Sequence, residues 1–451
     1  MNGIFEKRKL VKLNQVQYIA VGFFFIILIG AGLLTLPIAS KTGEWTNLFD
    51  TLFTATSATC VTGLVVYDTF RHWSIFGQLI ILTMIQIGGL GFITIGLSFA
   101  MAFRRKIGLR ERDLMMESVN AMEIGGIVRL VRRIIIGTAF FEGIGAVLLS
   151  IRFIPKFGPL KGIYYAIFHS ISAFCNAGFD LMGSREEYCS FVSYAGDPIV
   201  NFTLISLIVI GGLGFVVWSD LWSKRFSPKR YSLHTKIVLF VTIALLVGGA
   251  LLLFLFEKDN TMQGMTAGEK FWSSLFASAT ARTAGFNTID VGAMKPESKL
   301  LTIVLMFIGG SPGSTAGGVK TTTIAVMLMY VISNLRGENG CNVFHRRISD
   351  EIIKKASMVF CLNLFLGIAS TLVIMATSNL GMSDVLFEVI SAISTVGMTT
   401  GITRDLNTIG RIVIILLMFA GRIGSMTFAL SLIHKPEQAK ITLPEEKITI
   451  G

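Results

Sequence analysis

Four short segments of the sequence share one pattern, and this pattern decides the fold. They read FTATSATCVTGL over residues 53–64, FHSISAFCNAGF over 168–179, LFASATARTAGF over 275–286 and FEVISAISTVGM over 387–398. In each segment a large apolar residue stands ten positions before a glycine, and an apolar residue follows that glycine. The glycines are separated by 115, 107 and 112 residues. A spacing this regular indicates one structural unit that is used four times.

Long apolar runs flank each of these segments. Runs of about twenty apolar residues, the length that crosses a bilayer, predict eight membrane spans, at 16–39, 74–103, 127–154, 198–222, 234–256, 299–331, 352–378 and 408–433. Between the members of successive pairs lie the segments 47–59, 162–174, 268–281 and 383–394. They are too short to cross, and they favour re-entrant pore helices, which need protein or water around the backbone that follows.

The composition supports this interpretation and excludes others. The chain of 451 residues is 52% hydrophobic and only 15% charged, with a mean hydropathy of +0.68, whereas a soluble domain carries about a quarter charged residues. An ordinary globular enzyme is therefore excluded, and 35 Phe and 46 Gly exclude a disordered or coiled-coil protein. We expect an all-α polytopic membrane protein, in which four covalently linked span–pore-helix–span repeats surround a central pore.

The predicted spans divide the chain into six parts. These are a cytoplasmic N-terminus (1–15), repeat 1 (16–103), repeat 2 with the cytoplasmic loop before it (104–222), repeat 3 with an intramembrane loop (223–331), repeat 4 (332–434) and a cytoplasmic tail (435–451). The first apolar run is too long for a cleavable signal peptide. The five cysteines do not pair in obvious extracellular loops, so we predict no disulfide framework.

The positive charge indicates the orientation in the membrane. The net charge is +12, and the N-terminus, 104–133, 221–236, 331–355 and the tail together hold 25 of the 40 Lys and Arg. By the positive-inside rule both termini are cytoplasmic. Because topology accounts for most of the basic surplus, we expect no binding of nucleic acid.

The four matched glycines indicate an ion-binding role. Glycine is common in transmembrane helices, where it serves packing or a helix end, so a single one would be read as structural. A dehydrated cation at the membrane midplane, however, needs rings of oxygen, which backbone carbonyls supply when glycine permits a turn with positive φ. The C-termini of the pore helices would also point partially negative ends at the ion, which favours cations.

A second motif supports the prediction of a fourfold repeat. IGGLGF at 87–92 recurs at 210–215, and weaker forms follow as IGGSPG at 308–313 and FAGRIG at 419–424. With these motifs the chain resembles the Trk/Ktr/HKT potassium-transporter superfamily over residues 16–434, and it looks most like the membrane subunit of a bacterial Ktr system, of the KtrB or KtrD type. The resemblance implies potassium uptake across the cell membrane. It leaves open whether sodium stimulates transport or moves with potassium, as in a symporter.

The resemblance assigns a potassium-binding filter to the backbone of twelve residues. These are Val61, Thr62, Gly63, Asn176, Ala177, Gly178, Thr283, Ala284, Gly285, Thr395, Val396 and Gly397. In the family a serine at the first glycine position accompanies sodium transport, so four glycines favour potassium. The surrounding side chains differ between repeats, so we expect fewer equivalent carbonyl rings than in a potassium channel and looser discrimination between ions.

The third repeat contains GGSPGSTAGG at 309–318, which cannot form an uninterrupted helix because Pro312 lacks a backbone donor. Unwound backbone at this depth must line a cavity, and a simple proline kink is the alternative. The resemblance makes this segment a gate. Its predicted residues are Gly310, Ser311, Pro312, Gly313, Ser314, Thr315, Ala316, Gly317, Gly318 and, in the last span, Arg422.

Arg422 stands inside an otherwise apolar span. An arginine there costs at least about 3 kcal/mol. We therefore expect it to face the pore near the loop, where it would repel cations or donate to loop carbonyls. The alternative is an arginine that snorkels to the helix end.

Other polar residues in the spans are few. Lys320 is preceded by Val319, so its surroundings are not a phosphate-binding loop, and it is expected either to pair with carbonyls of the broken helix or to anchor the cytoplasmic side. Glu142 and Glu388 are candidate protonation sites, but we favour structural hydrogen bonding for both. The five histidines lack metal-ligand spacing, and no nucleophile–base pair stands out, so we expect neither enzyme activity nor a cofactor other than the transported ion.

The resemblance also implies partners. Members of the family form homodimers in the lipid membrane and pair with a cytosolic ring of RCK domains, which binds ATP or ADP and sometimes a cyclic dinucleotide. The nucleotide would bind that ring and not this chain. Candidate contact surfaces are the loops Arg104–Arg112 and Arg336–Arg347 and the tail after His434, although topology alone explains their charge equally well.

Two other classes of function are weaker. A secondary transporter that moves another solute by alternating access also uses broken helices. All four repeats here begin on the cytoplasmic side and run in one orientation, which favours a pore. A membrane-embedded enzyme or sensor would need an extramembrane domain, and the stretches 104–126 and 332–351 are too short to fold alone.

Overall fold

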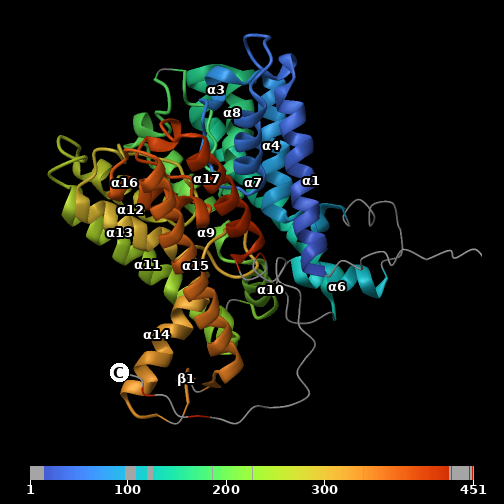
Figure 1. The fold of residues 1–451 in the computed structure, drawn as a ribbon, viewed down its shortest axis with the longest axis vertical. Helices are drawn as coiled ribbons and strands as arrows, with labels where there is room; N and C mark the ends of the chain where they lie inside the picture. Colours follow the sequence, from blue (N-terminus) through green and yellow to red (C-terminus); the bar gives the residue numbers. More distant parts are fainter. Residues whose placement is uncertain are drawn as a thin grey trace, which may run out of the picture.

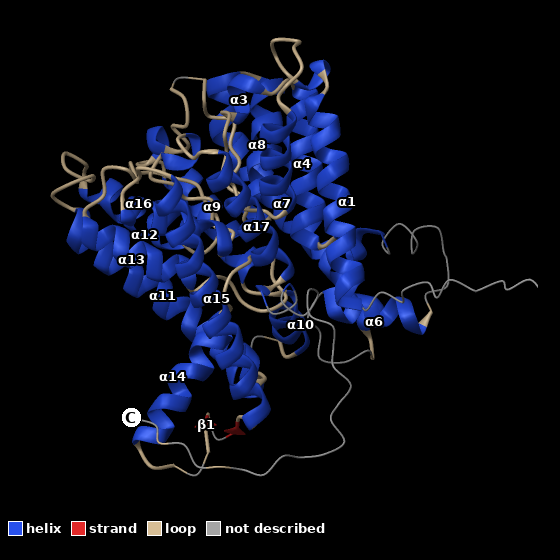
Figure 2. Ribbon diagram, in the orientation of Figure 1, coloured by secondary structure: helices blue, strands red, loops and turns tan. Residues whose placement is uncertain are grey.

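The computed structural model describes residues 15–96, 108–118, 125–184, 186–225, 227–338, 340–344 and 346–425, with the single positions 428, 446 and 449. Helices dominate this part of the chain (Figure 2). The strands within it, β1 (Asn342–Val343) and β2 (Arg346–Arg347), form one antiparallel hairpin. The expected all-α class is therefore confirmed.

The first helix of each predicted repeat is long and apolar. These helices are α1 (Gln15–Thr35), α7 (Ile127–Phe157), α11 (Leu233–Glu257) and α15 (Asp350–Thr377). Within the described residues they are the four helices that are long and apolar enough to cross a membrane as single helices. Large apolar side chains on them face outward, with Phe240 63% and Phe365 70% exposed. Such a surface is stable against lipid and not against water, so the chain is an integral membrane protein.

Four shorter helices follow the long ones. They are α2 (Leu48–Thr59), α8 (Pro159–Phe174), α12 (Ala267–Thr280) and α16 (Met382–Ile393), within three residues of the predicted re-entrant segments. Polar caps define two of their starts, because Asn47 accepts from the N–H of Phe49 and Thr266 forms a capping box with Glu269. At least half of each helix is buried, as expected for pore helices surrounded by spans.

In each repeat, the helix that begins the second predicted span is shorter than that span. These helices are α4 (Ile75–Leu90), α9 (Pro198–Gly212), α13 (Pro296–Phe307) and α17 (Thr408–Ile423). Three of them end at or just before a glycine with positive φ, namely Gly91 (83°), Gly214 (93°) and Gly424 (97°). A helix cannot continue through that conformation.

Three predicted spans are therefore wrong as continuous helices, and one of them, 408–433, breaks at Gly424. The span 198–222 breaks at Gly214, and α10 (Phe215–Ser223) turns by 93° from α9. The span 74–103 breaks at Gly91, and its last residues, like those of 408–433, lie outside the described part of the chain. The predicted break in 299–331 is confirmed, since α13 ends at Phe307 and α14 (Thr321–Leu335) begins only after an open stretch.

The helices pack in a closed ring. Each long helix packs against the pore helix of its own repeat, α1 on α2, α7 on α8, α11 on α12 and α15 on α16. The helix that begins the second span of each repeat packs against the pore helix of the next repeat, α4 on α8, α9 on α12 and α13 on α16. Finally α17 packs on α2, which joins the last repeat to the first. The boundaries between repeats stay predictions.

Short elements complete the described part. They are α3 (Thr69–His72), α6 (Leu109–Ser118) and the 3-10 turns Pro37–Ala39, Val192–Tyr194, Pro228–Arg230 and Ile402–Arg404. In Figure 1, α14, part of α15 and the β-hairpin form a projection at the end opposite α3. The predicted contact loop Arg336–Arg347 lies in this projection. The tail after His434 and the first part of Arg104–Arg112 lie outside the described residues, apart from two isolated positions in the tail.

Candidate filter and gate

The four glycine loops meet around one axis. In each loop, a Cβ atom built on the glycine would lie within 2.6 Å of a carbonyl oxygen in the next loop. The pairs are Gly63 with Ala177, Gly178 with Ala284, Gly285 with Val396, and Gly397 with Thr62. Because the fourth loop returns to the first, the loops form a ring, and the close approach of backbone to backbone requires glycine at each position.

The loops also share a backbone conformation. In each, the glycine and the residue two positions before it have positive φ. The values are 56° and 93° at Val61 and Gly63, 58° and 72° at Asn176 and Gly178, 79° and 82° at Thr283 and Gly285, and 51° and 86° at Thr395 and Gly397. Alternating conformations turn successive peptide groups toward the same side. Positive φ is strained for β-branched residues, and strain of this kind gathers at functional sites.

Hydroxyl groups of the pore helices hold these loops. Ser57 and Ser391 accept hydrogen bonds from the N–H of their filter glycines, at 3.0 and 3.1 Å. Ser172 and Thr280 instead donate to the carbonyl oxygen of the aromatic residue after the glycine, both at 2.7 Å. Two loops are thus supported in one way and two in another, so strict fourfold symmetry is absent, as predicted.

Sequence reasoning missed this support, although a signal was present. Serine stands six positions before the glycine in three segments. In the third segment Ala279 has that position, and the neighbouring Thr280 provides the hydroxyl. Between loops, the side chains of Asn176 and Thr283 hydrogen-bond at 3.1 Å.

The third repeat differs at Arg282, because its pore helix ends one residue earlier relative to the filter glycine, at Thr280. In the other loops the residue after the helix cap already has positive φ, whereas Arg282 separates the cap Ala281 from Thr283. Its buried guanidinium lies 3.5 and 3.4 Å from the carbonyl and hydroxyl oxygens of Thr242 on α11, and its Nε has no partner among the described residues. A positive charge here offsets the negative C-terminal end of α12.

The glycine motif of the second spans allows them to touch the pore helices. In three repeats, a Cβ atom on one motif glycine would collide with a carbonyl oxygen at the end of a pore helix. The pairs are Gly88 with Thr59, Gly211 with Phe174 and Gly421 with Ile393. The third repeat differs, because Gly309 lies against Gly317 of the unwound segment.

This unwound segment, 308–320, lies between α13 and α14 and contains the predicted gate residues Gly310–Gly318. The N–H of Ser311 donates to the carbonyl of Gly212, at the end of α9, at 3.0 Å. The hydroxyl of Thr315 donates to the carbonyl of Phe174 at 3.2 Å. On the other side Gly317 lies against the side chain of Thr395 in the fourth filter loop. The segment thus contacts elements of the second and the fourth repeats.

Arg422 connects the segment to the first repeat. Its Nη1 donates to the carbonyl of Thr315, and its Nη2 donates to the carbonyls of Gly88 and, at 2.9 Å, Gly89. Arg422 occupies the motif position at which the first and second repeats have Gly89 and Gly212. The expected bond to a loop carbonyl is therefore present.

Lys320 lies beside the same segment. Its Nζ donates to the carbonyls of Ala316 at 2.7 Å and Gly317 at 3.4 Å, so it pairs with the broken helix, the first of the two alternatives. Lys320 and Arg422 line a cavity of about 300 Å³, which has no carboxylate among its described lining residues. Two positive charges without a carboxylate oppose the entry of a cation.

The two membrane carboxylates make structural contacts. Glu142 accepts from the amide of Gln86 at 3.3 Å, and the thiol of Cys175 lies 4.0 Å from its other oxygen. Glu388 accepts from the hydroxyl of Thr403 at 2.5 Å. These contacts agree with the expected structural hydrogen bonding.

Comparison with known proteins places the chain in a family. A family model described as cation transport protein, TrkH, matches residues 7–443. The chain is 42% identical to the potassium/sodium uptake protein NtpJ of Enterococcus hirae, over 99% of this chain and 100% of that protein. It is also 42% identical to the Ktr system potassium uptake protein B of Bacillus subtilis, over 98% of each.

The fold is similar to that of a solved transporter. The crystal structure of the potassium transporter TrkH from Vibrio parahaemolyticus superposes with a TM-score of 0.74 at 18% identity, and the match covers 95% of this chain and 86% of that one. With a family model over nearly the whole length and relatives at 42% identity, the chain belongs to the TrkH family of cation transport proteins.

Proposed function

We propose that this chain takes up potassium across the cell membrane through the ring of four loops. The observation that carries this proposal is the closure of the ring, in which each filter glycine contacts a carbonyl of the next loop. Backbone carbonyls around one axis can replace the hydration shell of K⁺. The printed names of the relatives, which include potassium uptake and potassium/sodium uptake, support potassium as the ion and sodium as a second ion.

The twelve predicted residues from Val61 to Gly397 would bind the dehydrated ion through their carbonyl groups. The pore helices end at these loops, so their partially negative C-termini favour a cation. Below them, the segment Gly310–Gly318 would close the path, with Arg422 holding it in place. Opening then requires that the bond between Arg422 and Thr315 breaks and that the segment moves away from the axis.

The distribution of basic residues supports a membrane orientation, and the names of the relatives support a set of partners. The basic loops would face the cytoplasm, together with both termini. Because relatives are named as components of Ktr systems, we assign this chain the role of a membrane subunit. It would form a homodimer that a cytosolic ring of RCK domains regulates by binding ATP or ADP. The projection around Arg336–Arg347 is the proposed contact surface for that ring.

Uptake of rubidium, a potassium analogue, into proteoliposomes tests the proposal. The purified chain, with its regulatory ring supplied, is expected to take up rubidium above empty vesicles, and external potassium should compete. Uptake no greater than that of empty vesicles would contradict it. A reversal potential that follows the potassium gradient alone would separate a pore from coupled transport by alternating access.

A further inference from the structure

A second, larger cavity lies away from the filter, where α7, α10, α11, α14 and α15 meet. Its volume is about 880 Å³, within the range that holds small ligands. Four cationic side chains line it, Arg129, Arg133, Arg346 and Lys355. Among the described lining residues the single carboxylate is Asp220.

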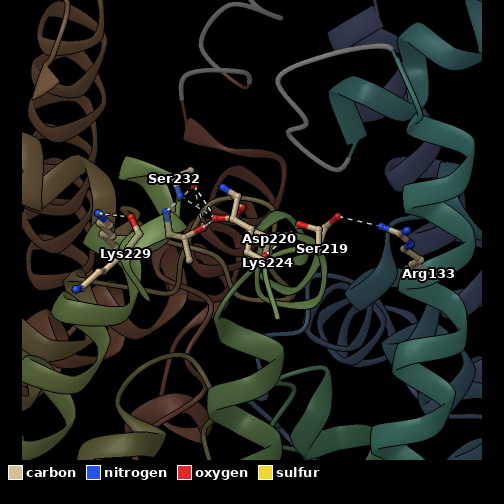
Figure 3. A network of polar contacts seen from close by, with 9 residues as sticks. Arg133, Ser219, Asp220, Lys224, Lys229 and Ser232 are labelled. Atoms are coloured by element: carbon tan, nitrogen blue, oxygen red, sulfur yellow. Dashed lines mark hydrogen bonds and ion pairs between the residues drawn. The ribbon is translucent and has the colours of Figure 1, made fainter. Parts of the chain in front are cut away.

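Asp220 does not neutralise these cations, because its oxygens are already occupied. It pairs with Lys224 at 2.6 Å and accepts from the hydroxyl of Thr235 at 2.7 Å and from the N–H of Ser232 at 2.9 Å. Figure 3 shows this network on one side and Arg133, which donates to Ser219 at 3.5 Å, on the other. None of the ion pairs between described residues involves any of the four cations.

The backbone adds to the positive potential. Three helices begin at this cavity, with Ile127 of α7, Leu233 of α11 and Thr322 of α14 in its wall. Helix N-termini carry partial positive charge and unpaired N–H groups. His234 also lines the cavity, and its Nε2 is buried without a partner in the described part of the chain.

We propose that this cavity binds a phosphate-bearing anion. Converging helix N-termini and arginines favour phosphate oxygens, and basic pockets between transmembrane helices on the cytoplasmic side take phospholipid headgroups. Two sources carry this chemistry, the headgroup of an anionic lipid in the adjacent leaflet and a soluble phosphate. The experiment below separates them.

The site is connected to the unwound segment. The N–H of Phe215, the first residue of α10, donates to the carbonyl of Gly313 at 2.8 Å. Thr323 and Val359 line both this cavity and the smaller one beneath the filter. Because the four cations lie on α7, α15 and β2, an anion that they bind draws these elements around α10 and the start of α14, and so stabilises the segment in its present position. This consequence, unlike the binding itself, rests on the proposed function.

Native mass spectrometry of the full chain in detergent tests the binding. Phosphatidylglycerol should bind more tightly than phosphatidylcholine with the same acyl chains. The variants Arg129→Gln and Arg133→Gln should each weaken phosphatidylglycerol binding about fivefold, since one cation near a membrane surface contributes about 1 kcal/mol. Arg132→Gln is the matched control, because Arg132 lies on the same helix but does not line the cavity, and it should bind like the wild type.

A titration with inorganic phosphate shows whether the bound anion is a lipid headgroup or a soluble phosphate. Displacement of phosphatidylglycerol would assign the site to soluble phosphate, and retention of the lipid would assign it to the headgroup. The proposal is overturned if both lipids bind equally and phosphate does not bind, or if Arg132→Gln loses as much binding as Arg129→Gln. Binding is measured without transport, so its failure is distinct from a failure of potassium uptake.

Discussion

Arg422 on α17 donates a hydrogen bond to the carbonyl oxygen of Thr315, in the segment that interrupts the third repeat. Its other terminal nitrogen donates to Gly88 and Gly89. One side chain thus ties together the first, third and fourth repeats below the filter. A partly buried charge within a membrane span is costly, and the carbonyl partners of Arg422 therefore indicate a role in holding this segment.

Replacing Arg422 with Gln should raise rubidium uptake measured without the regulatory ring. We expect an increase of at least about tenfold, because a hydrogen bond from a charged group contributes about 1.5–3 kcal/mol. Arg422→Lys, which keeps the charge but loses the planar fork, should show a smaller increase. If folded Arg422→Gln protein takes up rubidium at the wild-type rate, Arg422 does not hold the segment closed.

Ser57→Ala should weaken the discrimination between potassium and sodium. The substitution leaves the buried N–H of Gly63 without its acceptor, which costs about 1–3 kcal/mol and loosens the first loop. Competition of sodium against rubidium uptake measures this, and sodium should compete severalfold better than in the wild type. Ser57→Thr keeps the hydroxyl and is the control. Equal competition in the alanine variant and the wild type would show that the hydroxyl does not shape the filter.

Asp180, in the loop between α8 and α9, should make stability depend on pH. Burial raises the pKa of Asp180 to about 7; the charge of Asp68 adds to this effect and a hydrogen bond from the N–H of Met182 opposes it. An unfolded aspartate ionises near pH 4. The folded state therefore binds the proton more tightly, so this contribution to stability is full below pH 4 and is lost as the pH rises through about 7.

The effect is measured as the difference between the melting temperatures of the wild type and of Asp180→Asn, from about pH 4 to pH 9. The difference should fall as the pH rises to about 7 and then stay level. A constant difference would mean that Asp180 ionises in the folded protein as it does in the unfolded chain, and a difference that rises with pH would mean that folding lowers its pKa; either result contradicts the raised pKa.

The filter could be predicted from the sequence because its requirements are local. A backbone that approaches another backbone with positive φ requires glycine, and four glycines at one spacing reveal the repeat. The supporting hydroxyls were harder to recognise. Ser57 and Ser172 each stand six residues before their filter glycine, but Ser57 accepts a hydrogen bond from the loop and Ser172 donates one to it.

The ends of the second spans could not be predicted from hydropathy. The residues around Gly91 and Gly214 are as apolar as those of a continuous helix, and only the positive φ of these glycines ends it. The interruption of the third repeat was visible in Pro312, but its path was not. That path depends on partners distant in the sequence, such as Phe174 and Arg422.

Rubidium uptake by four single glycine variants tests most directly whether the four loops form one filter. The variants are Gly63→Ala, Gly178→Ala, Gly285→Ala and Gly397→Ala, with Gly143→Ala as control, because a Cβ atom at Gly143 meets no atom within 4 Å. We expect each of the four to lose at least about tenfold in uptake, since the left-handed conformation alone costs an L-residue about 1–2 kcal/mol and the new methyl strikes a carbonyl of the next loop. The control should match the wild type. Wild-type uptake by a folded variant at any one of the four positions would contradict a single filter built from four loops.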